Sequence, residues 1–413
     1  MKNTKYLNLR YMMMQVAYWA SYCALNGYAA VFLEDKGFSA GQTGILMAVG
    51  NALAAVLQPV AASRADRGKR ISMKEVILLC GAVSAAALGA LFFTGGSFAA
   101  VCTGFLIATV FQQIIQPLMN ALGMYFMDRG ERLNFGAARG IGSAGYAVSS
   151  YVIGSMTERI GVGIIPLISG VMSVVYLLIT LTFQMKEDRE TSAERQNVQA
   201  AGSRENETED AGGMLQILRE KKNFTCILTG IVFFFIFHFM TNTYIYQMIQ
   251  WVGGNKQDMG TAVFVAAMTE IPMMAGFSRL VKKFSVEELL RFAAVCWVVR
   301  AIVFCFCTNV TGIYGAQLMQ LVTYALYIPA GVYYANQEMD EHHKVQGQAM
   351  VTVAFTVGSV FGNLLGGRLI DSFGVPVMLR SGVAFAAVGL IFFFLGTADR
   401  KNVAKPVDGA GNM

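Results

Sequence analysis

Charged residues are scarce in this chain of 413 residues: they make up 14% of it, whereas a soluble protein has roughly 25%. Only 3 histidines and 7 cysteines are present, with no C-x-x-C pair and no His/Cys cluster, so a metal or redox centre is not expected. Paired acids and a nucleophile beside a base are also missing. The sequence therefore predicts no cofactor, no metal site and no enzyme.

Apolar residues, in contrast, are abundant and come in blocks of about 17–27 residues. Such blocks are long enough to cross the ~30 Å hydrocarbon layer as helices. The pattern predicts an all-α integral membrane protein with about twelve transmembrane helices, the first of which is too long for a signal-peptide core and is expected to be retained. The expected spans are residues 11–33, 41–63, 73–94, 97–125, 135–157, 163–184, 223–249, 259–278, 292–309, 311–335, 345–367 and 381–397.

Lysine and arginine are distributed unevenly between the loops. Most of the 32 fall in the N-terminal tail, the even-numbered loops and the C-terminal tail. The odd-numbered loops contain only Lys36, Arg159, Lys256, Arg368 and Arg380. Because positive loops stay in the cytoplasm, both termini are expected to be cytoplasmic in a multi-pass protein of the cell (inner) membrane. The net charge of +6 then reflects topology, and no nucleic-acid partner is expected.

One long polar segment, residues 185–222, interrupts the apolar blocks. It is too polar to bury a core and is interpreted as a cytoplasmic linker. It separates an N-terminal six-helix bundle, residues 1–184, from a C-terminal six-helix bundle, residues 223–413.

The two halves resemble one another at a constant offset of 213 residues. "GSMTERIGV" (Gly154–Val162) falls on "GRLIDSFGV" (Gly367–Val375), and both fit G-x-x-x-[ED]-x-x-G-V. The same offset also aligns the residues at the end of the second span, and the polar residues that follow it, with those of the eighth span. Parallel six-helix repeats of this kind form one large class of secondary transporters.

The loop "ASRADRGKR" (Ala62–Arg70) resembles the cytoplasmic loop motif of the major facilitator superfamily. The resemblance implies the major facilitator fold, with two pseudo-symmetric six-helix bundles and alternating access. It also implies a gating role for Asp66, Arg67, Lys69 and Arg70. The motif departs from the family pattern at Ala62, where glycine is usual, and it is one residue short before Gly68.

Four short stretches are similar to the oligosaccharide:proton symporters, the lactose permease-like group. They are "FGAARGIGSAGY" from Phe135, "MTEIPMM" from Met268, "VVRAIVF" from Val298 and "QPLMN" from Gln116. The resemblance implies sugar binding by an arginine and an aromatic residue of span five. The chain has Asn120 where the group has an acid. In span ten it has Gln317, Gln320, Thr323 and Tyr324 where the group has a histidine and an acid.

Glu270 is the only one of the 26 acidic residues at mid-span. A charge at the bilayer centre costs at least ~2.5 kcal/mol, which points to a function. We expect Glu270 to take up the coupled proton and Arg300, also mid-span, to stabilise its deprotonated form. The alternative is a fixed ion pair that only locks two helices. His238 is the only intramembrane histidine, and is either a hydrogen-bonded helix residue or a second proton carrier.

Arg139 and Tyr146 lie two helical turns apart and share one face of span five. With Asn120 and Glu270 they are predicted to bind substrate, opposite Asn242, Gln247 and Gln320. A guanidinium that only snorkels and a tyrosine that only packs are the alternatives.

The sequence therefore predicts a secondary transporter that moves a sugar or oligosaccharide with protons by alternating access. An organic anion such as an aromatic acid, or a nucleoside, remains open as substrate, because two intramembrane arginines accompany one glutamate. A channel is disfavoured, since no filter-like loop is present. The expected partners are the solute, protons and the lipid bilayer, and a monomer is expected.

Overall fold

The computed structural model describes residues 6–66, 72–93, 97–184, 216–340 and 343–397, and the regular elements in these residues are helices. The elements of the first half are α1 (Leu7–Tyr22), η1 (Cys23–Gly27), α2 (Ala29–Asp35), α3 (Ala40–Asp66), α4 (Met73–Phe93), α5 (Phe98–Asp128), α6 (Phe135–Arg159) and α7 (Ile164–Leu181). Those of the second half are α10 (Lys222–Thr243), α11 (Ile245–Trp251), α12 (Lys256–Leu280), α13 (Val286–Phe306), α14 (Val310–Leu318), η2 (Met319–Val322), α15 (Tyr324–Glu338), α16 (Lys344–Phe373) and α17 (Val375–Thr397).

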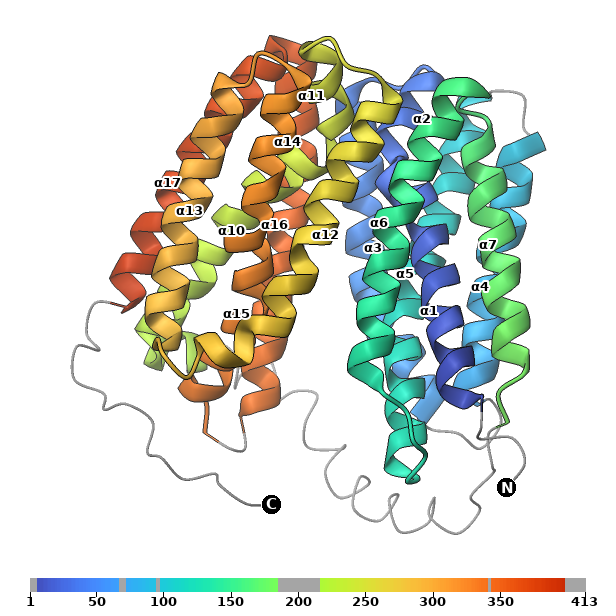
Figure 1. Cartoon of the computed structure of the whole chain (residues 1–413), viewed down its shortest axis with the longest axis horizontal. Coiled ribbons are helices and arrows are strands. Elements are labelled where there is room, and N and C mark those ends of the chain that lie inside the picture. Colours follow the sequence, from blue (N-terminus) through green and yellow to red (C-terminus); the bar gives the residue numbers. More distant parts are fainter. Residues whose placement is uncertain (1–5, 67–71, 94–96, 185–215, 341–342, 398–413) are drawn as a thin grey trace.

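The helices form two bundles that lie side by side, α1–α7 in one and α10–α17 in the other (Figure 1). The start of α1, the end of α7, the start of α10 and the end of α17 all lie on the same side of the molecule (Figure 1). We call this the linker side, and we call the other side, where α2 and α11 lie, the far side.

Nine helices of the described residues are long and apolar enough to cross a membrane. The other three spans are α6, which is rich in glycine and serine, and spans one and ten, which are divided into shorter pieces. With these included, the prediction of about twelve transmembrane helices is confirmed.

Three of the spans are not continuous α-helices. Span one contains the π-helix η1, span seven changes direction at Tyr244 between α10 and α11, and span ten contains the 3₁₀-helix η2. Such interruptions free backbone carbonyls and often lie at functional sites. They were not predicted, because each span is long enough to be interpreted as one continuous helix.

The internal repeat is confirmed in the bounds of the helices. A shift of 213 residues carries α4 onto α13 from end to end. Both helices begin with a Ser-x-x-Glu capping box, in which serine and glutamate satisfy backbone N–H groups of the first turn. In the first, Ser72 N donates to Glu75 Oε2 at 2.6 Å; in the second, Ser285 N donates to Glu288 Oε2 at 2.9 Å.

The shared motif G-x-x-x-[ED]-x-x-G-V connects the halves on the far side. Asp371 of α16 accepts hydrogen bonds from the Ser39 hydroxyl (2.6 Å) and the Gly41 N–H (2.9 Å), at the start of α3. Glu158 of α6 accepts one from the Lys256 N–H (3.2 Å), at the start of α12. Each acid thus binds free N–H groups at a helix N-terminus of the other half, where negative charge is favourable.

The same far-side ends pack at backbone distance. A Cβ atom on Gly154 of α6 would lie 2.8 Å from the Lys256 carbonyl oxygen and 3.0 Å from Gly260 Cα on α12. A Cβ atom on Gly367 of α16 would lie 2.2 Å from the Ala40 carbonyl oxygen on α3. No side chain fits at these contacts, so glycine is required for this arrangement of the halves.

We expect Gly154→Val to force the far-side ends apart, because a branched side chain cannot fit between α6 and α12. Spin labels at Asp35 and Trp251, in a variant without the seven native cysteines, should then report a longer distance between α2 and α11. Gly276→Val is the matched control on α12, since nothing lies within 4 Å of its added Cβ. An unchanged distance in Gly154→Val would contradict the required contact.

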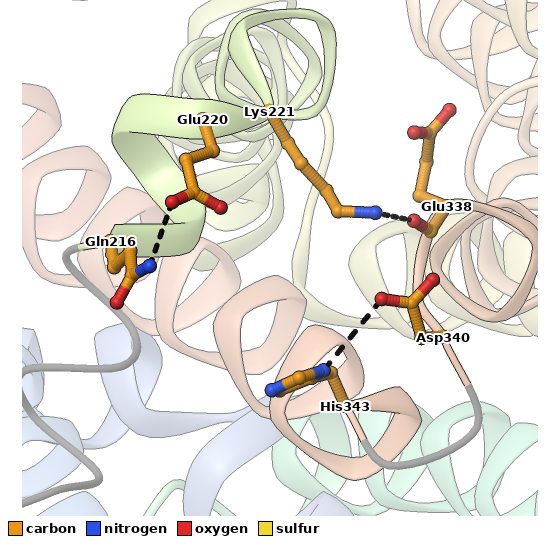
Figure 2. A network of polar contacts seen from close by, with 6 residues as sticks. All are labelled: Gln216, Glu220, Lys221, Glu338, Asp340 and His343. Atoms are coloured by element: carbon orange, nitrogen blue, oxygen red, sulfur yellow. Dashed lines mark hydrogen bonds and ion pairs between the residues drawn. The ribbon is translucent and has the colours of Figure 1, made fainter.

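On the linker side, the start of α10 is joined to the end of α15. The Lys221 ammonium donates to the carbonyl oxygen of Glu338, the last residue of α15 (Figure 2). A cation at a helix C-terminus is favourable because the last carbonyls carry partial negative charge. His343 Nδ1 lies 4.0 Å from Asp340 Oδ2 in the following turn. The Lys221 contact thus connects the first helix of the second bundle to the end of span ten.

The predicted gating loop cannot be assessed in the same way. Asp66 is the last residue of α3, and Arg67, Lys69 and Arg70 lie outside the described residues.

Candidate functional site

Three charged side chains of the membrane-spanning helices, from both halves, interact with one another. Arg139 lies on α6, Glu270 on α12 and Arg300 on α13. Both arginines interact electrostatically with Glu270, and Arg139 also interacts with Tyr324 of α15. The structure thus brings the three residues that the sequence singled out within electrostatic reach of one another: Arg139 and Glu270 lie on α6 and α12, which pack together between the bundles, and Arg300 is buried in the second bundle.

Arg300 holds the interrupted span ten. Its side chain is only 3% exposed, and Nε donates to the Ala316 carbonyl oxygen at 3.1 Å. Nη2 donates to Gln317 Oε1 at 2.5 Å, and Nη1 donates to Gln320 Oε1 and to Thr323 Oγ1. All four acceptors are neutral and lie in or beside η2. The guanidinium therefore binds one backbone carbonyl and three side-chain oxygens around the break in the helix.

Gln320 connects this cation to Glu270. Its Oε1 accepts from Arg300, and its Nε2 donates to Glu270 Oε1 at 3.4 Å. Among the described residues no direct ion pair joins Glu270 and Arg300. The sequence-based expectation of a direct partner is thus replaced by an amide bridge.

Arg139 contacts an aromatic ring, whereas Arg300 is held by hydrogen bonds. Its guanidinium carbon lies 4.5 Å from the ring centroid of Trp19 on α1, a cation–π distance. In the described part of the chain, no oxygen accepts a hydrogen bond from its N–H groups. Its donors are therefore available to a ligand, whereas those of Arg300 are used within the protein.

The Trp19 indole is itself fixed. Nε1 donates to Gln15 Oε1 at 3.2 Å, and Gln15 Nε2 donates to the Tyr11 hydroxyl at 3.1 Å. A Cβ atom on Gly142 of α6 would lie 2.7 Å from Trp19 Cδ1, so this glycine makes room for the ring. Trp19 was missed in the sequence. A glutamine four residues before an aromatic residue is common in helices, so the pattern around Trp19 does not point to a functional site.

Tyr146 packs edge-on against Trp19, with ring centroids 6.2 Å apart and an interplanar angle of 78°. A Cβ atom added to Gly27, at the end of η1, would lie 3.0 Å from the Tyr146 hydroxyl oxygen. Asn120 is half-buried on α5, and no hydrogen bond to its side chain is found within the described ranges. Tyr146 thus belongs to the Arg139 group, beside the interruption of span one.

Two of the predicted substrate-binding residues, Gln247 and Asn242, lie outside the group around Glu270. Gln247 of α11 donates to Glu34 Oε2 at 2.8 Å, and Gln250 donates to the same carboxylate at 3.2 Å. These bonds connect α2 and α11 on the far side. Asn242 is exposed near the end of α10. The structure therefore gives Gln247 a contact between the halves and does not group it with Glu270.

His238 is buried in an aromatic cluster of the second bundle. Its ring stacks on Tyr324 with centroids 4.8 Å apart and an interplanar angle of 6°. Trp297 and Phe235 lie beside it. His238 interacts electrostatically with Arg300, and Tyr324, on which its ring stacks, interacts with Glu270.

The model of the MFS_1 like family matches residues 8–380. The chain therefore belongs to this family, and it is a transporter of the major facilitator superfamily. It is 24% identical over 377 residues to the maltose permease of Geobacillus stearothermophilus, which covers 90% of each chain. It is 21% identical over 378 residues to an uncharacterized transporter, YwbF, of Bacillus subtilis (strain 168), covering 89% of this chain and 88% of the relative.

Solved structures show the same fold. The nucleoside transporter NupG matches with a TM-score of 0.75 at 14% identity, over 98% of this chain and 100% of NupG. A peptide transporter, POT, in complex with sulfate matches with a TM-score of 0.71 at 11% identity, over 94% of this chain and 93% of POT. The fold prediction, a major facilitator fold, is confirmed.

Proposed function

We propose that the protein is a proton-coupled symporter of a sugar or oligosaccharide. The observation that carries the proposal is the position of Glu270, a lone mid-membrane carboxylate at the interface of the bundles, bridged by Gln320 to span ten. The similarity to a maltose permease over most of both chains supports a sugar as substrate. Arg139, Tyr146 and Asn120 would contact the sugar from the first bundle, and Glu270 and Gln320 from the second.

Transport would follow from movement of the bundles, residues 1–184 and 223–413, about this group of residues. The uneven distribution of lysine and arginine supports a cytoplasmic linker side, with both termini and residues 185–222 in the cytoplasm. One coupled charge that crosses ~100 mV supplies about 2.3 kcal/mol, which corresponds to roughly fifty-fold accumulation of a neutral solute.

Transport of an organic anion is a second candidate. It is favoured by one observation: in the described residues no carboxylate pairs with Arg139, so the interface holds two guanidinium groups and one carboxylate. A substrate carboxylate would balance this charge.

The sugar proposal is tested with Arg139→Lys, which keeps the charge and loses the paired N–H groups that fit adjacent sugar oxygens. We expect at least a hundredfold loss of affinity for the sugar that binds the wild-type protein best, measured by calorimetry on purified protein. Tyr146→Trp keeps an aromatic edge beside Trp19 and should change affinity only a few-fold. Normal sugar binding by Arg139→Lys would contradict a substrate contact.

A further inference from the structure

We infer that the substrate is an acidic sugar, a hydroxylated ring that carries a carboxylate, and that Trp19 positions Arg139 to bind this carboxylate. The inference rests on the proposed sugar transport and narrows it to one chemical class. It also assigns to Trp19 the role of positioning Arg139.

The first argument is charge. Arg300 donates only to neutral oxygens, and Glu270 bonds to the Gln320 amide, so the interface is positive even when Glu270 is ionised. It becomes more positive when Glu270 takes up the coupled proton. Positive charge away from water is costly unless an anion neutralises it. A neutral sugar leaves this charge in place, whereas a carboxylate removes one unit of it.

The second argument is the geometry of the Arg139–Trp19 contact. A carboxylate partner would occupy two of the five N–H donors of the guanidinium in its plane. The face of an indole occupies none of them, since a cation–π contact is made above the ring. Trp19 therefore fixes the guanidinium and leaves its forked edge free. A free fork matches the two oxygens of a carboxylate.

The third argument concerns hydroxyl groups. Gln116 and Asn120 lie one helical turn apart on α5, and both are half-buried. Within the described residues neither side chain has a hydrogen-bond partner. Each amide offers both donors and acceptors, as sugar hydroxyls require. We place the sugar hydroxyls against these two amides, which an aliphatic or aromatic acid would leave unused.

Binding of matched ligands tests the charge. Glucuronate and its amide, glucuronamide, have the same ring and differ in one charge. We expect wild-type protein to bind glucuronate at least tenfold more tightly than glucuronamide or maltose, and Arg139→Gln to lose this preference. Tighter or equal binding of maltose or glucuronamide would overturn the acidic sugar and leave the proposed sugar transport intact. Binding of benzoate without any of the three sugars would overturn both.

Transport gives an independent test. An acidic sugar that moves with one proton carries no net charge, whereas a neutral sugar with one proton carries one positive charge. In proteoliposomes, glucuronate accumulation should follow a pH gradient and should not change when valinomycin and potassium set an inside-negative potential. Accumulation of maltose that rises severalfold with this potential, without accumulation of glucuronate, would show a neutral substrate and overturn the inference.

Trp19 variants separate positioning from folding. Trp19→Phe keeps a ring below Arg139 and should retain most of the preference for glucuronate over glucuronamide. Trp19→Leu keeps an apolar side chain and removes the cation–π contact, so the preference should fall about tenfold. A general packing defect would weaken both ligands equally and would leave their ratio unchanged, which would contradict the positioning role.

Discussion

Replacing Glu270 by glutamine is expected to abolish substrate accumulation driven by a pH gradient. The amide has the shape of the protonated carboxyl but cannot release a proton, so movement of the bundles is no longer tied to proton movement. At a pH difference of one unit, wild-type protein can accumulate substrate about tenfold, since one unit corresponds to about 1.36 kcal/mol per proton. Glu270→Gln should reach no accumulation in proteoliposomes. It should still exchange external for internal substrate, because exchange needs no net proton transfer.

The matched control is Glu220→Gln, which makes the same chemical change at an exposed carboxylate on the linker side (Figure 2). This variant should accumulate substrate like the wild type. Accumulation by Glu270→Gln at the wild-type level would show that Glu270 is not the coupling residue. His238, stacked on Tyr324, would then be the next residue to test.

Replacing Arg300 by methionine is expected to destabilise the protein and to stop transport in every mode, exchange included. Methionine leaves Gln317, Gln320 and the Ala316 carbonyl without their buried donor. Hydrogen bonds from a charged group contribute about 1.5–3 kcal/mol each, so a loss of at least ~3 kcal/mol is expected. Thermal unfolding in detergent should show a melting temperature lower by several degrees.

Arg300→Lys distinguishes the two roles considered for this residue. If Arg300 only supplied charge to Glu270, lysine would preserve function. If it holds span ten, lysine should fail as methionine does, because one ammonium cannot reproduce the forked contacts. Arg380→Met, on an exposed position of α17, is the control and should unfold like the wild type. An unchanged melting temperature for Arg300→Met would refute the structural role.

The spans and the repeat could be predicted because both depend on local patterns. Length and hydropathy define a transmembrane helix, and the repeated G-x-x-x-[ED]-x-x-G-V motif preserves its spacing in both halves. The interruptions at η1, Tyr244 and η2 could not be predicted. No proline lies in η1 or η2, so the usual sequence signal of a helix break is missing there. Their positions depend on contacts between helices that a linear pattern does not contain.

The candidate site, too, could be predicted only in part. Charge in an apolar block is visible in a sequence, so Glu270, Arg139 and Arg300 could be selected. The residues that these three side chains contact could not be identified from the sequence. Arg300 donates to the Ala316 carbonyl and to side chains around η2, and the position of η2 is not marked in the sequence. Trp19 contacts Arg139 across two helices that are more than a hundred residues apart in the sequence.

The far-side contacts of Glu158 and Asp371 have a consequence for the origin of the chain. Each acid lies near the end of the fifth span of its half and binds the equivalent helix start of the other half, so the two contacts are reciprocal. Reciprocity of this kind is the property of an isologous dimer, in which both subunits use the same surface. A six-helix ancestor with one acid and one free helix start could therefore have paired with a second copy of itself. Gene fusion would then have joined two subunits whose interface already existed.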